Sequence, residues 1–125
     1  MPAAEYRKLT FIAWLLAAVV MIVSCGSAAW QATNWYTDDF MRLGQVKDLL
    51  AGQAWNDLTQ YRLGSPGGTA MHWSRLPDVP IALVALALSP LLGLDDALAA
   101  AAIVLPPVYM LIFLLPFASA SRLQL

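Results

Sequence analysis

The sequence has few charged residues and almost no cysteine. Only 12 % of its 125 residues are charged and 60 % are hydrophobic, whereas roughly a quarter of an ordinary soluble domain is charged. This composition excludes an ordinary soluble domain and indicates an integral membrane protein. The net charge is −1 and the basic residues are scattered, so we expect no nucleic-acid partner. Cys25 is the single cysteine, which excludes an intrachain disulfide and a zinc site built from cysteines.

The longest uncharged run, residues 9–30, predicts a first transmembrane helix. At 1.5 Å rise per residue it reaches about 33 Å, enough to cross a bilayer. Arg7 and Lys8 precede it, so by the positive-inside rule the tail 1–8 is cytoplasmic and the chain emerges on the outer side. Three aromatic residues follow where the outer interface is expected: Trp30, Trp35 and Tyr36.

The same region has a second interpretation, because Ile22–Gly26 resembles a lipoprotein cleavage box around Cys25. A signal peptide has an apolar core of roughly 7 to 15 residues, which is shorter than this run. Later spans also make a lipid anchor redundant. We therefore interpret Cys25 as a small residue within the first span.

Two further apolar runs predict additional spans. Residues 79–94 form the shorter run, with Pro80 in the first turn and Pro90 near the end, where it should kink the helix. Residues 97–118 are again uncharged and long enough to cross, with Pro106-Pro107 in the middle. These prolines free backbone carbonyls, so this helix is expected to have neighbouring helices.

The predicted fold class is therefore an all-α integral membrane protein with three transmembrane helices and a helical outer loop. The loop comprises residues 31–78, and a short tail, residues 119–125, follows the third span. In this order the tail is on the outer side, where Arg122 departs from the positive-inside rule. Three predicted spans, two of them containing helix-bending prolines, resemble the opening of a larger multi-pass protein of the bacterial inner membrane.

The outer loop is predicted to open with an amphipathic helix over residues 38–52. Thr37 is a candidate N-cap, Asp38 and Asp39 favour the positive end of the helix dipole, and Gly52 suits a left-handed stop. One face of this helix is apolar, a stripe formed by Phe40, Leu43, Val46 and Leu50. We expect this stripe to lie on the membrane surface or against other helices.

The adjacent carboxylates Asp38 and Asp39 have two interpretations. As helix-capping groups, each stabilises the first turn by about 0.3 to 1 kcal/mol, and Asp38 is spaced to pair with Arg42. As a chemical site, the pair is suited to act as a general base, or to hold a divalent cation such as Mg²⁺ or Mn²⁺ that neutralises a phosphate leaving group. The spacing alone leaves both interpretations open.

The rest of the outer loop is expected to be irregular. Residues 64–68, Gly-Ser-Pro-Gly-Gly, predict a turn. The segment 71–75 combines the only histidine, His72, with Trp73 and Arg75. These groups are suited either to lipid headgroups at an aromatic belt or to the wall of a substrate pocket.

The order of these features resembles the N-terminal part of C-type (GT-C) glycosyltransferases, membrane enzymes that use polyprenyl-phosphate-linked sugar donors at the outer membrane face. The resemblance covers most of residues 9–94 and rests on an outward span followed by DDFMRLGQVKDLLAG and DLTQYRLGSPGGTAMHWSRLPDVPIA. It is strongest to bacterial oligosaccharyltransferase-like proteins. Members of that family carry roughly a dozen spans, and this chain has three predicted ones.

The resemblance implies that Asp38 and Asp39 are the acidic motif of the first outer loop, where one of them binds acceptor or metal. From their chemistry, Arg42, His72 and Arg75 are hypothetical contacts for the donor phosphate. The implied partners are membrane lipid, the lipid-linked sugar donor, and further transmembrane helices or a partner subunit. The alternative is a small non-enzymatic membrane subunit or assembly factor that docks a partner through the outer helix, in which the carboxylates only cap.

Overall fold

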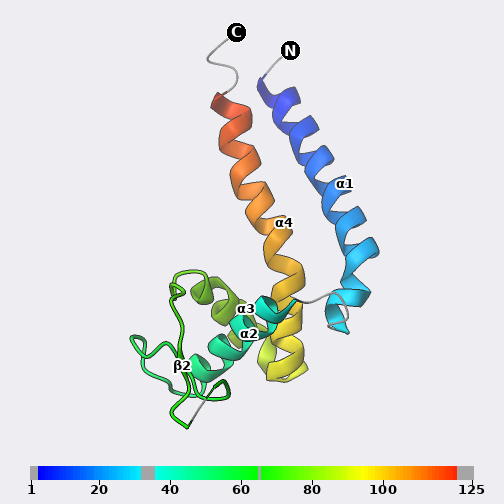
Figure 1. Ribbon diagram of the computed structural model, residues 1–125. Coiled ribbons are helices and arrows are strands. Elements are labelled where there is room, and N and C mark those ends of the chain that lie inside the picture. Colours follow the sequence, from blue (N-terminus) through cyan, green and yellow to red (C-terminus); the bar gives the residue numbers. More distant parts are fainter. Residues whose placement is uncertain (1–2, 32–35, 65, 121–125) are drawn as a thin grey trace. The chain divides into compact units, whose positions relative to one another are not determined.

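The computed structural model describes residues 3–31, 36–64 and 66–120. Trp35 and the tail residues 121–125, for which interface and outer-side positions are predicted, lie outside this range. The described chain is mainly helical, as predicted, and its elements in chain order are α1 (Ala3–Trp30), α2 (Thr37–Leu50), β1 (Thr59–Gln60), β2 (Thr69–Ala70), α3 (Asp78–Leu92) and α4 (Leu94–Ala120) (Figure 1).

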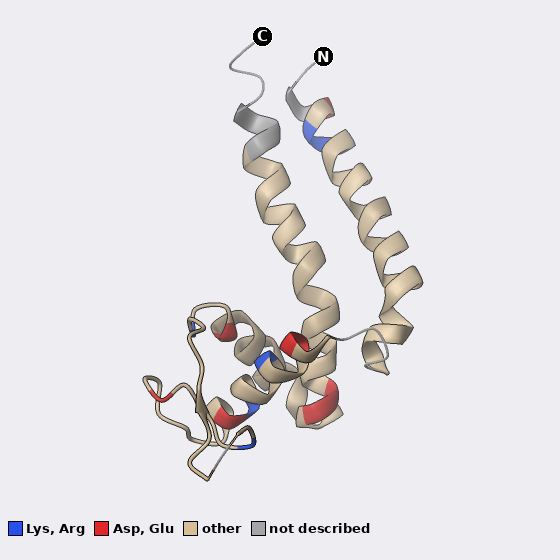
Figure 2. Ribbon diagram, viewed as in Figure 1, with Lys and Arg blue, Asp and Glu red and all other residues tan. Residues whose placement is uncertain are grey.

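Two of these helices are long and apolar enough to cross a membrane. The qualifying segments are Glu5–Trp30 in α1 and Leu94–Pro116 in α4, and the described parts of both helices lack charged residues over most of their length (Figure 2). The helix at the second predicted span, α3, has 15 residues. At 1.5 Å per residue it is about 22 Å long, shorter than the roughly 30 Å hydrocarbon core.

The chain divides into two compact units, which are described separately. The first unit contains residues 1–33 and 102–125, and in it α1 and α4 run antiparallel (Figure 1). Trp14 Nε1 donates a 2.8 Å hydrogen bond to the carbonyl oxygen of Pro107. The sequence predicted that the helix with Pro106-Pro107 has neighbouring helices, and in this unit α1 is such a neighbour of α4.

This hydrogen bond gives a testable prediction. Trp14→Phe removes the donor and keeps an aromatic ring, so the α1–α4 pair should lose about 0.6 to 1.7 kcal/mol, the range for hydrogen bonds between membrane helices. An SDS titration of the full-length protein in micelles should show an earlier unfolding midpoint. Trp30→Phe is the control because Trp30 is half exposed, and an equal effect of both substitutions would count against the bond.

The second unit, residues 34–101, has a small core between three helices. Its buried apolar residues come from α2, α3 and the first turns of α4: Leu43, Val46, Ala82, Ala85, Ala97 and Leu98. Val46 and Ala85 are fully buried. The alanines let the helix backbones approach closely. The apolar stripe of α2 is thus largely internal, since Leu43, Val46 and Leu50 contribute to this core while Phe40 stays half exposed.

Local features of the second unit correct three details of the sequence analysis. Tyr36, not Thr37, occupies the N-cap position of α2, and the helix ends at Leu50 rather than at residue 52. Gly52 does follow in the left-handed region, with φ of +104°. The outer loop is also less irregular than expected, because β1 and β2 pair antiparallel with Thr59 opposite Ala70 and Gln60 opposite Thr69.

Candidate functional site

The two carboxylates of the acidic motif have different surroundings in the first turn of α2. Asp39 Oδ2 accepts a 2.9 Å hydrogen bond from the backbone N–H of Tyr36, so Asp39 acts as a cap for the start of the helix. Asp38 is exposed, and within the described part of the chain its side chain has neither a hydrogen bond nor an ion pair. Both carboxylates lie in the first turn, where they interact favourably with the helix dipole. Only Asp39 also caps by a hydrogen bond, so the oxygens of Asp38 are available to other groups.

Arg42, one turn further along α2, does not pair with Asp38 as the spacing had indicated. Its guanidinium donates to Asp78 Oδ1 at 2.8 Å and to the carbonyl oxygen of Ser74 at 2.9 Å. It also lies over the ring of Trp73, 4.8 Å from the centroid, a cation–π distance. A quarter of the Arg42 side chain is exposed, so one edge of this cation reaches solvent.

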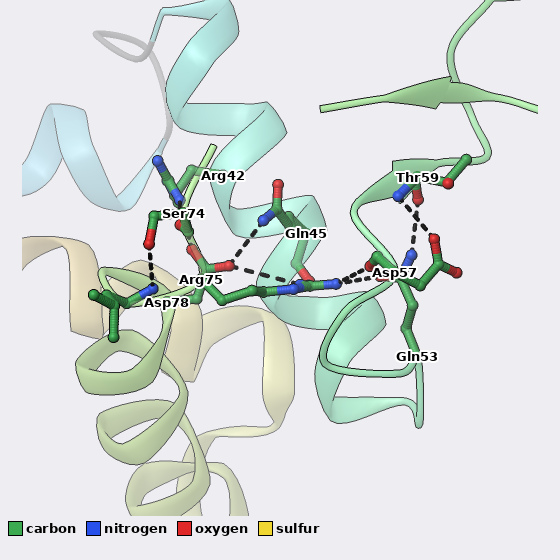
Figure 3. A network of polar contacts seen from close by, with 9 residues as sticks. Arg42, Gln45, Gln53, Asp57, Thr59, Ser74, Arg75 and Asp78 are labelled. Atoms are coloured by element: carbon green, nitrogen blue, oxygen red, sulfur yellow. Dashed lines mark hydrogen bonds and ion pairs between the residues drawn. The ribbon is translucent and has the colours of Figure 1, made fainter. Parts of the chain in front are cut away.

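Arg75 is buried, with 4 % of its surface exposed. It donates to the carbonyl oxygen of Gln45 at 3.1 Å, to Gln53 Oε1 at 3.0 Å, and to the carbonyl oxygen of Asp57 (Figure 3). These partners come from α2 and from the segment that follows it. Arg75, predicted as a contact for the donor phosphate, therefore directs its hydrogen bonds to groups of the protein itself.

Asp78, the first residue of α3, is the centre of this polar network and is fully buried. Its Oδ2 accepts from Gln45 Nε2 at 3.0 Å and lies 3.6 Å from Arg75, while its Oδ1 accepts from Arg42. A buried carboxylate needs such partners because its desolvation costs several kcal/mol. Asp78 was predicted only as the last residue of the outer loop, and nothing in the sequence pattern indicated this role.

His72 is exposed and lies beside the network rather than in it. Its ring meets Trp73 edge-on, with 6.2 Å between centroids. Trp73 therefore contacts both His72 and Arg42. Of the three residues predicted to contact phosphate, the structure brings Arg42 and His72 to the same ring and places Arg75 in the interior.

Asp57 shows the clearest electrostatic effect in the outer segment. The pKa of Asp57 is lowered from 3.8 to about 2 by hydrogen bonds that its carboxylate accepts. The main donor is Thr59, chiefly through its backbone N–H at 3.0 Å, and the Tyr61 hydroxyl donates at 2.9 Å. The charged carboxylate holds the turn into β1, and in return Asp57 raises the pKa of the Tyr61 phenol.

This depressed pKa gives a pH prediction. Because the pKa of Asp57 is lower in the folded state than in the unfolded chain, its contribution to stability is complete above about pH 4 and is lost as the pH falls toward 2. In Asp57→Asn the amide oxygen still accepts a hydrogen bond but does not titrate. Thermal melts should therefore show wild type losing its advantage over this variant between those pH values. A constant difference would contradict the assignment.

The fit of a divalent cation depends on Asp38 and Asp39. Asp39 already uses one oxygen in the cap, and the described residues contain no cluster of three or more acidic, histidine or cysteine ligands. Mg²⁺ is commonly held by one or two carboxylates together with substrate phosphates. Asp38 and the second oxygen of Asp39 are thus sufficient only for a cation that a phosphate helps to bind.

Comparison with known proteins does not assign the site, since no protein-family model, curated protein or solved structure matches this chain. The site is therefore described by its own geometry. Among the described residues, α2 begins with one carboxylate that has no partner, Asp38, and one that caps the helix, Asp39. A largely buried network of two arginines and one aspartate connects α2 with the start of α3.

Proposed function

We propose that this chain is the N-terminal part of a GT-C-type glycosyltransferase that transfers a sugar from a polyprenyl-phosphate-linked donor at the outer face of the bacterial inner membrane. The observation that supports this most is the free carboxylate of Asp38. It stands exposed at the start of a helix whose other charged groups are largely engaged with protein partners. A general base must be free to accept a proton in this way.

The position of Asp38 in the chain supports a reaction near the membrane. It is eight positions along the chain from Trp30, the last residue of α1. An extended chain spans at most about 3.5 Å per residue, so Asp38 lies within about 28 Å of the end of that apolar helix. Such a distance suits a donor whose phosphate is anchored in the lipid headgroup layer.

In this proposal Asp38 takes a proton from the acceptor as the acceptor attacks the anomeric carbon. The bond between that carbon and the phosphate oxygen breaks, and the lipid phosphate leaves with the bonding electrons. The exposed edge of Arg42 and the His72 ring, which flank Trp73, are the proposed contacts for the leaving phosphate. In the alternative with a divalent cation, Asp38 and the second oxygen of Asp39 would hold the ion, which would neutralise charge on the leaving phosphate, and Asp38 would then be a ligand rather than the base.

The alternative, a non-enzymatic subunit that docks through the apolar stripe of α2, receives less support. Leu43, Val46 and Leu50 belong to the core of the second unit, so the stripe already has a partner within the chain. Docking through these residues would require that core to open.

The proposal is tested in inner membranes that contain the full-length protein. Membranes are incubated with a panel of radiolabelled polyprenyl-phosphate sugars, and label in the acceptor fraction is measured. The double substitution Asp38→Asn with Asp39→Asn should abolish donor-dependent transfer while the protein level stays unchanged. Transfer that survives the double substitution would refute the catalytic role.

A further inference from the structure

A contact within the second unit bears on how often the chain crosses the membrane. Lys47 of α2 forms an ion pair with Asp95 in the first turn of α4, with 2.5 Å between Nζ and Oδ1. In addition to this ion pair, Leu43 and Val46 of α2 pack in one core with Ala97 and Leu98 of α4. The start of α4 is therefore in direct contact with the segment that follows α1.

This contact conflicts with a crossing by α3. The bilayer's hydrocarbon core is about 30 Å thick. If α3 crossed it, Asp95 would lie on the opposite side from Lys47, and neither the ion pair nor the shared core would form. We propose that the chain crosses the bilayer twice, through α1 and α4, and that α3 stays in the outer leaflet with its exposed leucine face against lipid acyl chains.

The first unit provides independent support, because α1 and α4 run antiparallel and Trp14 bonds to Pro107 between them. In a chain with three successive crossings, the first and third helices run in the same direction. With two crossings they run in opposite directions, as they do here.

The charge distribution of the sequence also fits two crossings. Arg7 and Lys8 precede the first span and Arg122 follows the last. Two crossings place these three on the cytoplasmic side, which the positive-inside rule favours, while the four basic residues of the outer segment stay outside in either arrangement. Three crossings place Arg122 outside, the departure noted from the sequence.

The surface of α3 indicates lipid as its occupant. Ala82 and Ala85 face the core, whereas Leu83, Leu86 and Leu91 are 62 %, 54 % and 83 % exposed. On a helix Leu83 and Leu91 lie on the side away from Ala82 and Ala85, and Leu86 lies at the border between the two sides. Only Gly93 separates α3 from the apolar helix α4, so the C-terminal end of α3 is held where α4 enters the membrane. Leucines at that depth bury apolar surface in the leaflet, which favours insertion.

Cysteine labelling of the full-length protein in right-side-out vesicles tests the crossing number. In a Cys25→Ser background, single cysteines are introduced as Glu5→Cys, Ala51→Cys, Asp96→Cys and Gln124→Cys and treated with a membrane-impermeant maleimide. Asp96→Cys should label in intact vesicles like the control Ala51→Cys, which lies in the exposed outer segment. Glu5→Cys and Gln124→Cys should label only after permeabilisation. Protection of Asp96→Cys, or labelling of Gln124→Cys in intact vesicles, would overturn the proposal.

A second measurement tests the lipid contact. A bimane fluorophore on Leu86→Cys should be quenched at least twofold more by brominated acyl chains than the same fluorophore on Ala51→Cys. Equal quenching at the two sites would show that the leucine face of α3 lies outside the acyl layer.

Discussion

Replacing Asp38 by asparagine is expected to lower sugar transfer by at least about 100-fold, the lower end of what a positioned general base contributes. Asparagine keeps the size and polarity of the side chain but cannot accept the proton. Because Asp38 has no protein partner among the described residues, folding and membrane insertion should be unaffected. The measurement is the initial rate of label transfer at matched protein levels.

Asp39→Asn is the matched control. The asparagine oxygen still accepts the hydrogen bond from the Tyr36 N–H, and only the charge interaction with the helix dipole is lost, about 0.3 to 1 kcal/mol. Transfer should remain close to wild type. If Asp39→Asn instead caused a loss as large as Asp38→Asn, and chelation by EDTA reproduced it, the two residues would act together as a cation site and Asp38 would not be the sole essential carboxylate.

The second large effect is expected on stability, from Asp78→Ala. This change removes a fully buried carboxylate and leaves Arg75, also buried, without its ion pair. Breaking a buried pair from one side typically costs about 3 to 5 kcal/mol. Limited proteolysis of the full-length protein in micelles should show rapid cleavage between α2 and α3, because α2 is then held to α3 by its apolar contacts alone.

Asp48→Ala is the control for this effect. Asp48 pairs with Arg62 through two hydrogen bonds, but the Arg62 side chain is 59 % exposed. Exposed ion pairs contribute about 1 kcal/mol or less, so protease resistance should change little. Comparable losses of protease resistance in both variants would show that the network around Asp78 contributes no more to stability than an exposed ion pair.

Much of the helical layout could be predicted from the sequence, because it depends on local patterns. The uncharged runs predicted both long apolar helices. The acidic turn of Asp38 and Asp39, together with Gly52, predicted α2 to within two residues at its C-terminal end. The N-cap of α2 was predicted one residue too late, at Thr37 instead of Tyr36. The cap uses the backbone N–H of Tyr36, which the pattern of side chains does not reveal.

The tertiary contacts could not be predicted in this way. Spacing along one helix predicts that Arg42 pairs with Asp38. In the structure Arg42 instead bonds to Asp78, 36 positions away, because a buried carboxylate without a partner is energetically costly. For the same reason Arg75 was assigned to substrate, since nothing in its neighbourhood along the chain reveals Gln45 and Gln53 as its partners. Hydrophobicity predicted a span at α3, but it could not identify α2 and the start of α4 as the partners of this helix.

The proposed use of a lipid-linked sugar through Asp38 can be measured as donor turnover by purified full-length protein in liposomes. Release of free polyprenyl phosphate is measured for each donor of the panel, with cell-extract acceptors supplied. We expect release from at least one donor, in proportion to protein concentration. Release should be lost in Asp38→Asn and retained in Asp39→Asn. Folded wild-type protein that releases no lipid phosphate from any donor, or equal release by wild type and Asp38→Asn, would contradict the proposal.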